Sequence, residues 1–289
     1  MVVALRPRQW LKNVLVFAAP LAAGQLFAAH VLLPSIGAFI AFCAISSATY
    51  LVNDARDVDA DRAHPTKRAR PIAAGHLPKS TAIVMAAVLA LGSLGLSLWI
   101  RPALAAVVLA YFVFTLSYSL LLKHEPVVEL ALLSVGFLLR AIAGGVASNL
   151  PISQWFLIVA GFGSLFMAAG KRYSELRAVT DADPLAERVP QRRALSGSTI
   201  GYLRFVWGTA AAVTISAYCL WAFDVGQHGN GALWAQWSIV PFVMALLRYA
   251  VIIDGGGAEA PEDAVLGDKV LLILGLAWAV LFTMGALGV

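Results

Sequence analysis

Charged residues are scarce in this chain of 289 residues. Asp, Glu, Lys and Arg together make up 13% of it, and hydrophobic residues make up 60%. An ordinary soluble domain has about 25% charged and about 45–50% apolar residues. With a mean hydropathy of +0.81, the composition excludes an ordinary soluble domain. It predicts a chain that lies largely within a membrane.

Cysteine is also rare, and no His or Cys stands out as a nucleophile. Cys43 and Cys219 both fall in apolar runs, so we expect buried thiols and no disulfide. No short apolar core with a small-residue cleavage site follows the cationic start, so we expect no cleavable signal peptide. The sequence pI near 9.4 could suggest nucleic acid. Cations that flank membrane helices instead favour anionic headgroups or a phosphorylated substrate.

Apolar runs near the roughly 20 residues that a spanning helix needs recur along the whole chain. Helices are the expected fold because backbone groups in lipid must be hydrogen-bonded internally. The sequence therefore predicts an all-α polytopic membrane protein with a single domain over 1–289. The nine expected spans are 14–33, 35–53, 80–99, 103–122, 127–147, 153–170, 200–223, 233–253 and 269–288.

The charges fall on one side of these spans. All of the 21 Lys and Arg residues except Arg101 and Arg140 lie at the end that carries the N-terminus, and so do all of the 16 acids except Asp224. The positive-inside rule puts that end in the cytoplasm. Because carboxylates contribute little to orientation, the acids need another explanation.

The stretch "NDARDVDADRAHPTKRARPIAAG" at 53–75 offers one. On a continuing helix, Asp54, Asp57 and Asp61 share a face, Asn53 joins its edge, and Asp59 points elsewhere. Like charges on one face repel unless a cation binds. Oxygen ligands without His or Cys suit Mg²⁺.

A basic loop broken by two prolines follows these acids. It contains Lys67, Arg68 and Arg70. Arg can hold a phosphate in a bidentate fork, and Lys supplies a point charge. Metal-binding acids beside phosphate-binding cations indicate a diphosphate site, although each cation could equally serve only to set the orientation.

"NDARDVDAD" resembles the N-D-x-x-D-x-x-x-D motif of the UbiA superfamily of intramembrane prenyltransferases. "RPRQWLKN" near the start, "KRARPIAAG" and "LLRAIAGG" at 138–145 are similar to that superfamily too. The resemblance implies a helical bundle around a central cavity, capped by cytosolic loops that hold Mg²⁺ and a diphosphate substrate.

The sequence departs from most of the superfamily after the sixth expected span. There "GKRYSELRAVTDADP" replaces a second aspartate-rich motif, with Glu175 as the main acid beside Lys171 and Arg172, while Asp181 and Asp183 lie too far along. More cations and fewer carboxylates favour two phosphorylated substrates over a neutral phenol. With "RYAVIIDGGGAEAPEDAVLGD", this stretch resembles the decaprenyl-phosphate phosphoribosyltransferase branch of actinobacterial cell-wall synthesis.

That branch implies an enzyme of the bacterial plasma membrane that makes a precursor of cell-wall arabinan. Its reaction transfers 5-phosphoribose from phosphoribosyl pyrophosphate (PRPP) to a polyprenyl (decaprenyl) phosphate and releases pyrophosphate. The acidic loop ending in Thr-Gly, with which soluble phosphoribosyltransferases bind PRPP, does not occur in this sequence. We expect Mg²⁺ as cofactor and membrane lipid as a partner, and a homo-oligomer is left open. The expected metal ligands are Asn53, Asp54, Asp57 and Asp61; the expected catalytic residues are Asp54, Asp57 and Glu175; and the expected substrate contacts are Lys12, Lys67, Arg68, Arg70, Lys171, Arg172 and Tyr173.

Three other interpretations stay open at this point. A UbiA-type enzyme could transfer a polyprenyl group from its diphosphate to an aromatic acceptor, which "KRYSE" disfavours. A transporter would normally carry ionisable residues near the bilayer midplane, where this sequence has few. A scaffold would not need four metal-type ligands.

Two single residues also have two interpretations each. Arg140 is either a structural pair or a substrate contact, and Asp268 is either a helix cap or a site residue.

Overall fold

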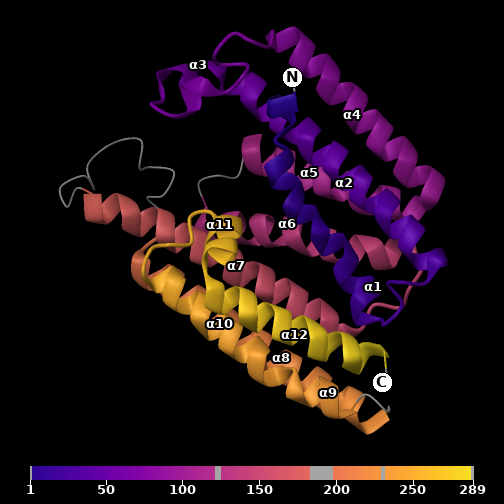
Figure 1. The fold of residues 1–289 in the computed structure, drawn as a ribbon. Coiled ribbons are helices and arrows are strands. Elements are labelled where there is room, and N and C mark those ends of the chain that lie inside the picture. The colour runs from indigo at the N-terminus through magenta and orange to yellow at the C-terminus, as the bar shows by residue number, and fades with distance from the viewer. Residues whose placement is uncertain (1, 121–124, 183–197, 229–231, 288–289) are drawn as a thin grey trace. The chain divides into compact units, whose positions relative to one another are not determined.

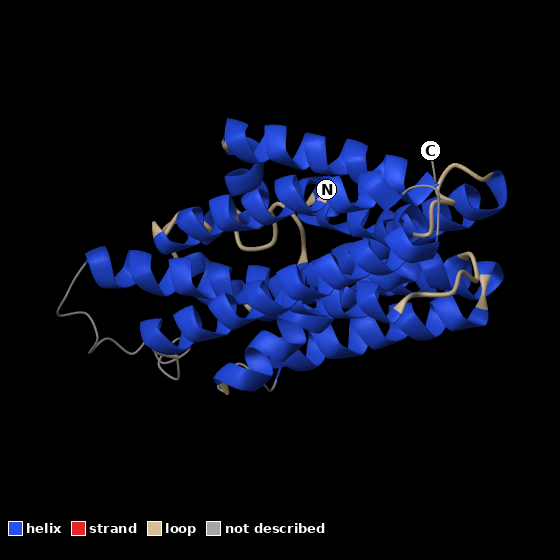
Figure 2. Ribbon diagram, turned by 90° about the horizontal axis from the view of Figure 1, so that it is seen from below, coloured by secondary structure: helices blue, strands red, loops and turns tan. Residues whose placement is uncertain are grey.

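The computed structural model describes residues 2–120, 125–182, 198–228 and 232–287. Helices and their connections make up all of this described part, which contains no strand (Figures 1 and 2). The 3₁₀ helices are η1 (Val2–Leu5), η2 (Pro7–Phe17) and η3 (Lys67–Ala69). The α-helices are α1 (Ala18–Ala22), α2 (Ala29–Arg56), α3 (Val58–Ala63), α4 (Lys79–Ile100), α5 (Pro102–Leu120), α6 (Pro126–Ala147), α7 (Gln154–Ala182), α8 (Ile200–His228), α9 (Ala232–Trp237), α10 (Ile239–Asp254), α11 (Pro261–Gly267) and α12 (Lys269–Leu287).

The predicted polytopic all-α fold is confirmed, but the count of nine spans is not. Within the described ranges, seven helical segments are long and apolar enough to cross a membrane, and the apolar stretch Pro102–Ser117 of α5 is shorter. The expected span 14–33 is wrong as a single helix. The segment is instead divided between η2, the short α1 and the start of α2. Gly24, with φ +66°, makes the turn after α1, a backbone conformation that residues with a side chain rarely adopt.

Two compact units make up the chain. The first contains residues 1–20, 26–121 and 139–150, and the second contains 21–25, 122–138 and 151–289. Helix α6 contributes its first part to the second unit and its last part to the first.

Small residues line the helix contacts of the first unit. Ala38, Ala41 and Ala48 on α2 are fully buried, and so is Ala82 on α4. Ser93 of α4 donates a hydrogen bond of 2.8 Å to the carbonyl of Ala41. In lipid, where water does not drive helices together, small side chains stabilise a pair by letting the backbones approach.

The N-terminal segment runs antiparallel to α2. Trp10 donates to Ser47 Oγ at 3.0 Å, and farther along η2 Asn13 Nδ2 lies 3.3 Å from Cys43 Sγ. Asn13 also accepts a hydrogen bond of 2.8 Å from Arg140, which donates to the Tyr111 hydroxyl at 2.6 Å. Arg140 is thus part of a buried polar network in the first unit, as its structural interpretation predicts.

An aromatic core joins α7, α8 and α10 in the second unit. Phe166 makes edge-on contacts with Trp207 and Tyr249, with ring centroids 6.4 and 5.7 Å apart. Gly170 lets α10 approach closely, since a Cβ there would lie 2.4 Å from Cδ1 of Ile253. This packing holds the charged end of α7 beside the end of α10.

Many hydroxyl groups in both units bond within their own helix. The hydroxyl donates to the carbonyl four residues earlier, at 2.5–2.9 Å, in Ser35, Thr49, Thr115, Ser134, Ser164, Thr214 and Thr283. Each of these polar groups is therefore satisfied without a partner on a neighbouring helix.

Candidate active site

The acidic motif lies where α2 gives way to α3. Helix α2 ends at Arg56, and Asp57, with φ −89° and ψ 16°, separates it from α3. Backbone hydrogen bonds nevertheless continue with helical spacing, from Asp57 to the carbonyl of Asn53 and from Asp61 to that of Asp57. Asp54 and Asp61 therefore keep a common face, and both carboxylates are buried, at 4% and 3% exposure.

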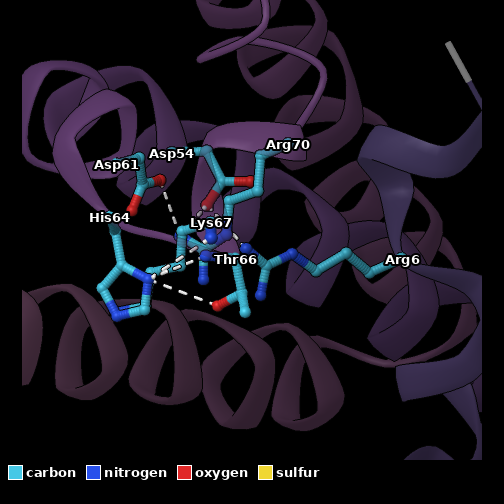
Figure 3. Close-up of polar contacts among 7 residues, drawn as sticks. All are labelled: Arg6, Asp54, Asp61, His64, Thr66, Lys67 and Arg70. Carbon is cyan, nitrogen blue, oxygen red and sulfur yellow. Dashed lines mark hydrogen bonds and ion pairs between the residues drawn. The ribbon is translucent and has the colours of Figure 1, made fainter.

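Arg70 bridges these two buried carboxylates. Its Nη1 lies 3.2 Å from Asp54 Oδ1 and 2.7 Å from Asp61 Oδ2 (Figure 3). One cationic nitrogen thus stands between the acids that the sequence assigns to a metal. A buried carboxylate is costly unless it is paired and hydrogen-bonded, and Arg70 meets that need.

Arg6 reaches the same carboxylate from the N-terminal segment. Its Nη2 lies 2.6 Å from Asp54 Oδ1 (Figure 3). Its guanidinium lies over the ring of Tyr50, 4.8 Å from the centroid. The backbone of Arg6 is left-handed, with φ 53° and ψ 60°, which is uncommon for a residue other than glycine. Sequence reasoning did not assign Arg6 to the site, although it is the first residue of the quoted "RPRQWLKN".

The remaining acids of the motif lie in different surroundings. Asp57 is partly buried and has no ion-pair partner among the described residues. Asn53 is also partly buried. Asp59 points away, as expected, with a side chain that is 90% exposed and lies 3.5 Å from Arg62.

The loop after α3 is organised by a histidine. His64 Nδ1 lies 3.3 Å from the backbone nitrogen of Thr66 and 3.4 Å from that of Lys67 (Figure 3). Lys67 and Arg68 are exposed, which leaves both cations accessible to an anion. Lys12 contacts Gln9 Oε1 at 2.6 Å, one helical turn away on η2.

The motif offers the kind of oxygen donors that Mg²⁺ prefers. In the described part of the chain, no three His, Cys, Asp or Glu side chains are grouped closely enough to hold a metal ion. Asp54 and Asp61 nevertheless both contact Arg70 Nη1, so two carboxylates already converge on one positive charge. A hard dication with several waters needs only a few such oxygens.

The second unit repeats this arrangement at the charged end of α7. Arg172 contacts Glu129 of α6 and, at 2.6 Å, Glu175 Oε2. Lys171 lies 3.7 Å from Glu175 Oε1. Sequence reasoning did not single out Glu129. Asp183 lies outside the described residues, and so does the side chain of Asp181.

Tyr173 lies in a second polar group of this unit. Its side chain is 1% exposed, and its hydroxyl lies 3.1 Å from Asp254 Oδ1 and 2.8 Å from Arg204 Nη2. Arg204 also contacts Asp254 at 2.9 Å. Sequence reasoning did not identify this pairing. A contact between Tyr173 and a substrate stays a prediction.

The last polar loop is held by an ion pair and a cap. Helix α11 begins at Pro261. Arg248 Nη2 lies 2.6 Å from Asp268 Oδ2, and Asp268 Oδ1 accepts the backbone N–H of Leu271 at 2.9 Å. Of the two alternatives for Asp268, the structure shows the helix cap. The hydrogen bond from Arg248, together with the backbone donor of Leu271, lowers the pKa of Asp268 below its ordinary value.

Residues 14–266 match the model of the UbiA prenyltransferase family. Among curated relatives, the decaprenyl-phosphate phosphoribosyltransferase of Corynebacterium glutamicum is 51% identical over 98% of this chain and 86% of its own. The enzyme of that name from Mycolicibacterium smegmatis is 49% identical over 98% and 90%.

Solved structures agree on the fold. A UbiA homologue from Archaeoglobus fulgidus bound to GPP and Mg²⁺ is similar with a TM-score of 0.66 and 17% identity, over 99% of this chain and 98% of its own. The family match spans most of the sequence, and the described segments supply the helical fold that the family shares. The chain is therefore a multi-pass membrane protein that belongs to the UbiA prenyltransferase family.

Proposed function

We propose that this enzyme transfers 5-phosphoribose from PRPP to decaprenyl phosphate. The observation that carries the proposal is the 49–51% identity, over nearly the whole chain, to relatives named for this reaction. The buried acids bracketed by arginines support it, since a diphosphate donor needs cations and metal ligands together.

In the proposed reaction the bond between C1 of the ribose and the pyrophosphate oxygen breaks, and its electron pair leaves with pyrophosphate. An oxygen of the lipid phosphate forms the new bond to C1 from the opposite face, with inversion. The attacking phosphate is already an anion near neutral pH, so no strong general base is required. The products are pyrophosphate and a phosphoribosylated lipid phosphate that serves as a precursor of cell-wall arabinan.

In this proposal Mg²⁺ would be held by Asn53, Asp54, Asp57 and Asp61. When bound, the ion would neutralise charge that develops on the leaving pyrophosphate. Lys67, Arg68 and Arg70 would hold the phosphates of the donor, and Lys12 is assigned to the lipid phosphate. The exposure of Lys67 and Arg68 supports these roles.

The second group of proposed site residues lies on α7 and consists of Lys171, Arg172, Tyr173 and Glu175. Arg172 and Lys171 both contact Glu175, so the acid holds two cations near the end of α7. We assign these cations to donor phosphates, and Tyr173 and Glu175 to the ribose or a second metal ion. The single catalytic domain over 1–289 and a homo-oligomer stay predictions.

A second candidate function is transfer of a polyprenyl group from its diphosphate to an aromatic acceptor. It is favoured by the likeness of the fold to a structure described with GPP and Mg²⁺. It is disfavoured by the stretch "KRYSE", which stands where aromatic prenyltransferases of the superfamily carry a second aspartate-rich motif.

A transfer assay tests the proposal. Purified protein in detergent is incubated with radiolabelled PRPP, decaprenyl phosphate and Mg²⁺, and label is counted in the organic phase. We expect transfer in the wild type, loss with EDTA, and a reduction of at least about 100-fold in Asp57→Ala, as for loss of groups that stabilise the leaving charge. Asp59→Asn is the matched control, because this exposed acid of the same segment should be dispensable.

Other results would overturn the proposal. Turnover with only polyprenyl diphosphate and an aromatic acceptor would establish the second candidate. Transfer that persists in both EDTA and Asp57→Ala would show that the acidic motif does not serve the reaction.

A further inference from the structure

Two arginines occupy the acidic motif in a way that the proposed roles do not explain. Arg70 was assigned to donor phosphates, yet its guanidinium lies between Asp54 and Asp61. Arg6 contacts Asp54 from the N-terminal segment, 48 residues earlier in the chain. A metal ion that binds Asp54 and Asp61 must therefore displace these two cations or bind beside them.

The charges in this group are balanced. Two buried carboxylates face two guanidiniums, each of which is less than a third exposed. A dication that entered this group by itself would meet two fixed positive charges at close range. Like charges at such distances, in a partly buried environment, repel strongly. The four side chains by themselves are therefore a poor site for a free metal ion.

A diphosphate changes this balance. It supplies negative charge that can accept an arginine fork, so Arg70 gains a new partner at the moment when the acids gain the metal. Asp57 can make the first contact with the ion, since it is partly buried and has no ion pair within the described part of the chain.

We infer that Arg6 and Arg70 are positioning residues that hold the place of the metal, and that Arg70 moves from Asp54 and Asp61 to the diphosphate when the metal enters. Metal and donor then bind together and each strengthens the other. This inference rests on the proposed function for the identity of the donor, but its chemistry requires only a diphosphate.

Arg6 and Arg70 have different parts in this exchange. Arg6 is held by its contact with Tyr50 and by a backbone that Ser47 fixes through a 2.9 Å hydrogen bond to the carbonyl of Leu5. Arg70 lies in the connection between η3 and α4 and has an extended backbone. Arg6 therefore keeps Asp54 oriented while Arg70 changes partners.

Equilibrium dialysis with Mn²⁺ tests the inference. Protein in detergent is dialysed with and without inorganic pyrophosphate, and bound metal is compared at equal free Mn²⁺ measured in the protein-free chamber. In the wild type we expect weak binding of Mn²⁺ alone and an increase in affinity of at least about tenfold with pyrophosphate, within the usual range of coupling between ligands.

Loss of the Arg70 charge should raise the affinity for Mn²⁺ alone and reduce the increase in affinity that pyrophosphate causes. Arg70→Gln should bind Mn²⁺ alone at least about threefold more tightly than the wild type, and pyrophosphate should then add less than about threefold. Arg70→Lys keeps the charge and should bind Mn²⁺ alone as weakly as the wild type. Lys79→Gln, an exposed cation at the start of α4, is the matched control and should leave both values unchanged.

The inference is overturned if Arg70→Gln binds Mn²⁺ alone no more tightly than the wild type. If that variant does not fold, Arg6→Gln takes its place, and unchanged binding of Mn²⁺ alone in Arg6→Gln is equally a contradiction. Failure of the proposed function looks different: coupling with pyrophosphate would be intact, but no phosphoribose would reach the lipid.

Discussion

At the scale of single residues, the first unit depends on a glycine at a close helix approach. A Cβ built on Gly144 of α6 would lie 2.0 Å from the carbonyl oxygen of Val16 on η2 and 3.0 Å from Pro20 Cγ. The nearest obstacle is backbone and cannot move aside as a flexible side chain could. Gly144 thus fixes how closely the N-terminal segment packs on α6.

Gly144→Ala should therefore destabilise the protein by about 1–3 kcal/mol, the usual range for overpacking in a close contact. The measurement is the melting temperature in detergent. Gly92→Ala is the matched control, since a Cβ at that position of α4 meets nothing within 4 Å. Alanine is the better helix former, so the control should melt at the same temperature or higher. Equal losses in both variants would contradict this account of Gly144.

Residue types could be predicted from the sequence, but their pairings could not. Helical spacing indicated that Asp54 and Asp61 share a face and that Asp59 does not, and the structure agrees. The contacts of Arg6 with Asp54 and of Arg172 with Glu129 join residues 48 and 43 positions apart. Hydropathy and spacing describe one segment at a time, so they carry no information about such pairs.

At the scale of elements, long apolar runs were predictable and interrupted ones were not. The runs expected at 80–99 and 127–147 became Lys79–Ile100 and Pro126–Ala147. The expected run 14–33 was instead divided between the end of η2, α1 and the start of α2. Gly24, with its left-handed backbone, interrupts this run. A hydropathy window averages over about 20 residues, so it does not detect a break at one residue.

Helix α12 gives a prediction about pH, because its start is held by Asp268. The contacts with Arg248 and the Leu271 N–H lower the pKa of this carboxyl in the folded protein. A lowered folded-state pKa means that the contribution to stability is complete above the unfolded value of about 3.9 and is lost as the pH falls through the folded value. Asp268→Asn should therefore lower the melting temperature at pH 7, and the difference from the wild type should shrink towards pH 3.

Asp263→Asn is the control for this experiment. Asp263 is exposed on the neighbouring α11, so its loss should change the melting temperature little at any pH. A deficit in Asp268→Asn that stayed constant from pH 7 to pH 3 would show that the ion pair does not contribute.

At the scale of the whole molecule, orientation follows from where the charges gather. In the first unit, the contact between Arg6 and Asp54 places the N-terminal segment and the acidic motif at the same end of α2. Arg101 and Asn149, which are 2.7 Å apart, lie beyond the other end of α4. We propose that the end with the acidic motif faces the cytoplasm, in line with the excess of Lys and Arg there.

Cysteine labelling checks this orientation. In a background with Cys43 and Cys219 replaced by alanine, Thr66→Cys should react with a membrane-impermeant maleimide only after the cells are permeabilised. Asn149→Cys should react in intact cells. The reverse pattern would show that the acidic motif faces outward, where PRPP from metabolism would not reach it.

The hydroxyls that bond back to their own helices have a consequence for how the protein is assembled. Ser35, Thr49, Ser134 and Thr214 are buried, yet each is satisfied by a carbonyl four residues earlier. These hydroxyls are thus shielded from lipid before their helices pack against neighbours. Substitutions that weaken packing should then leave helices inserted but unassembled, a species that membrane proteases would remove while translocation itself proceeds normally.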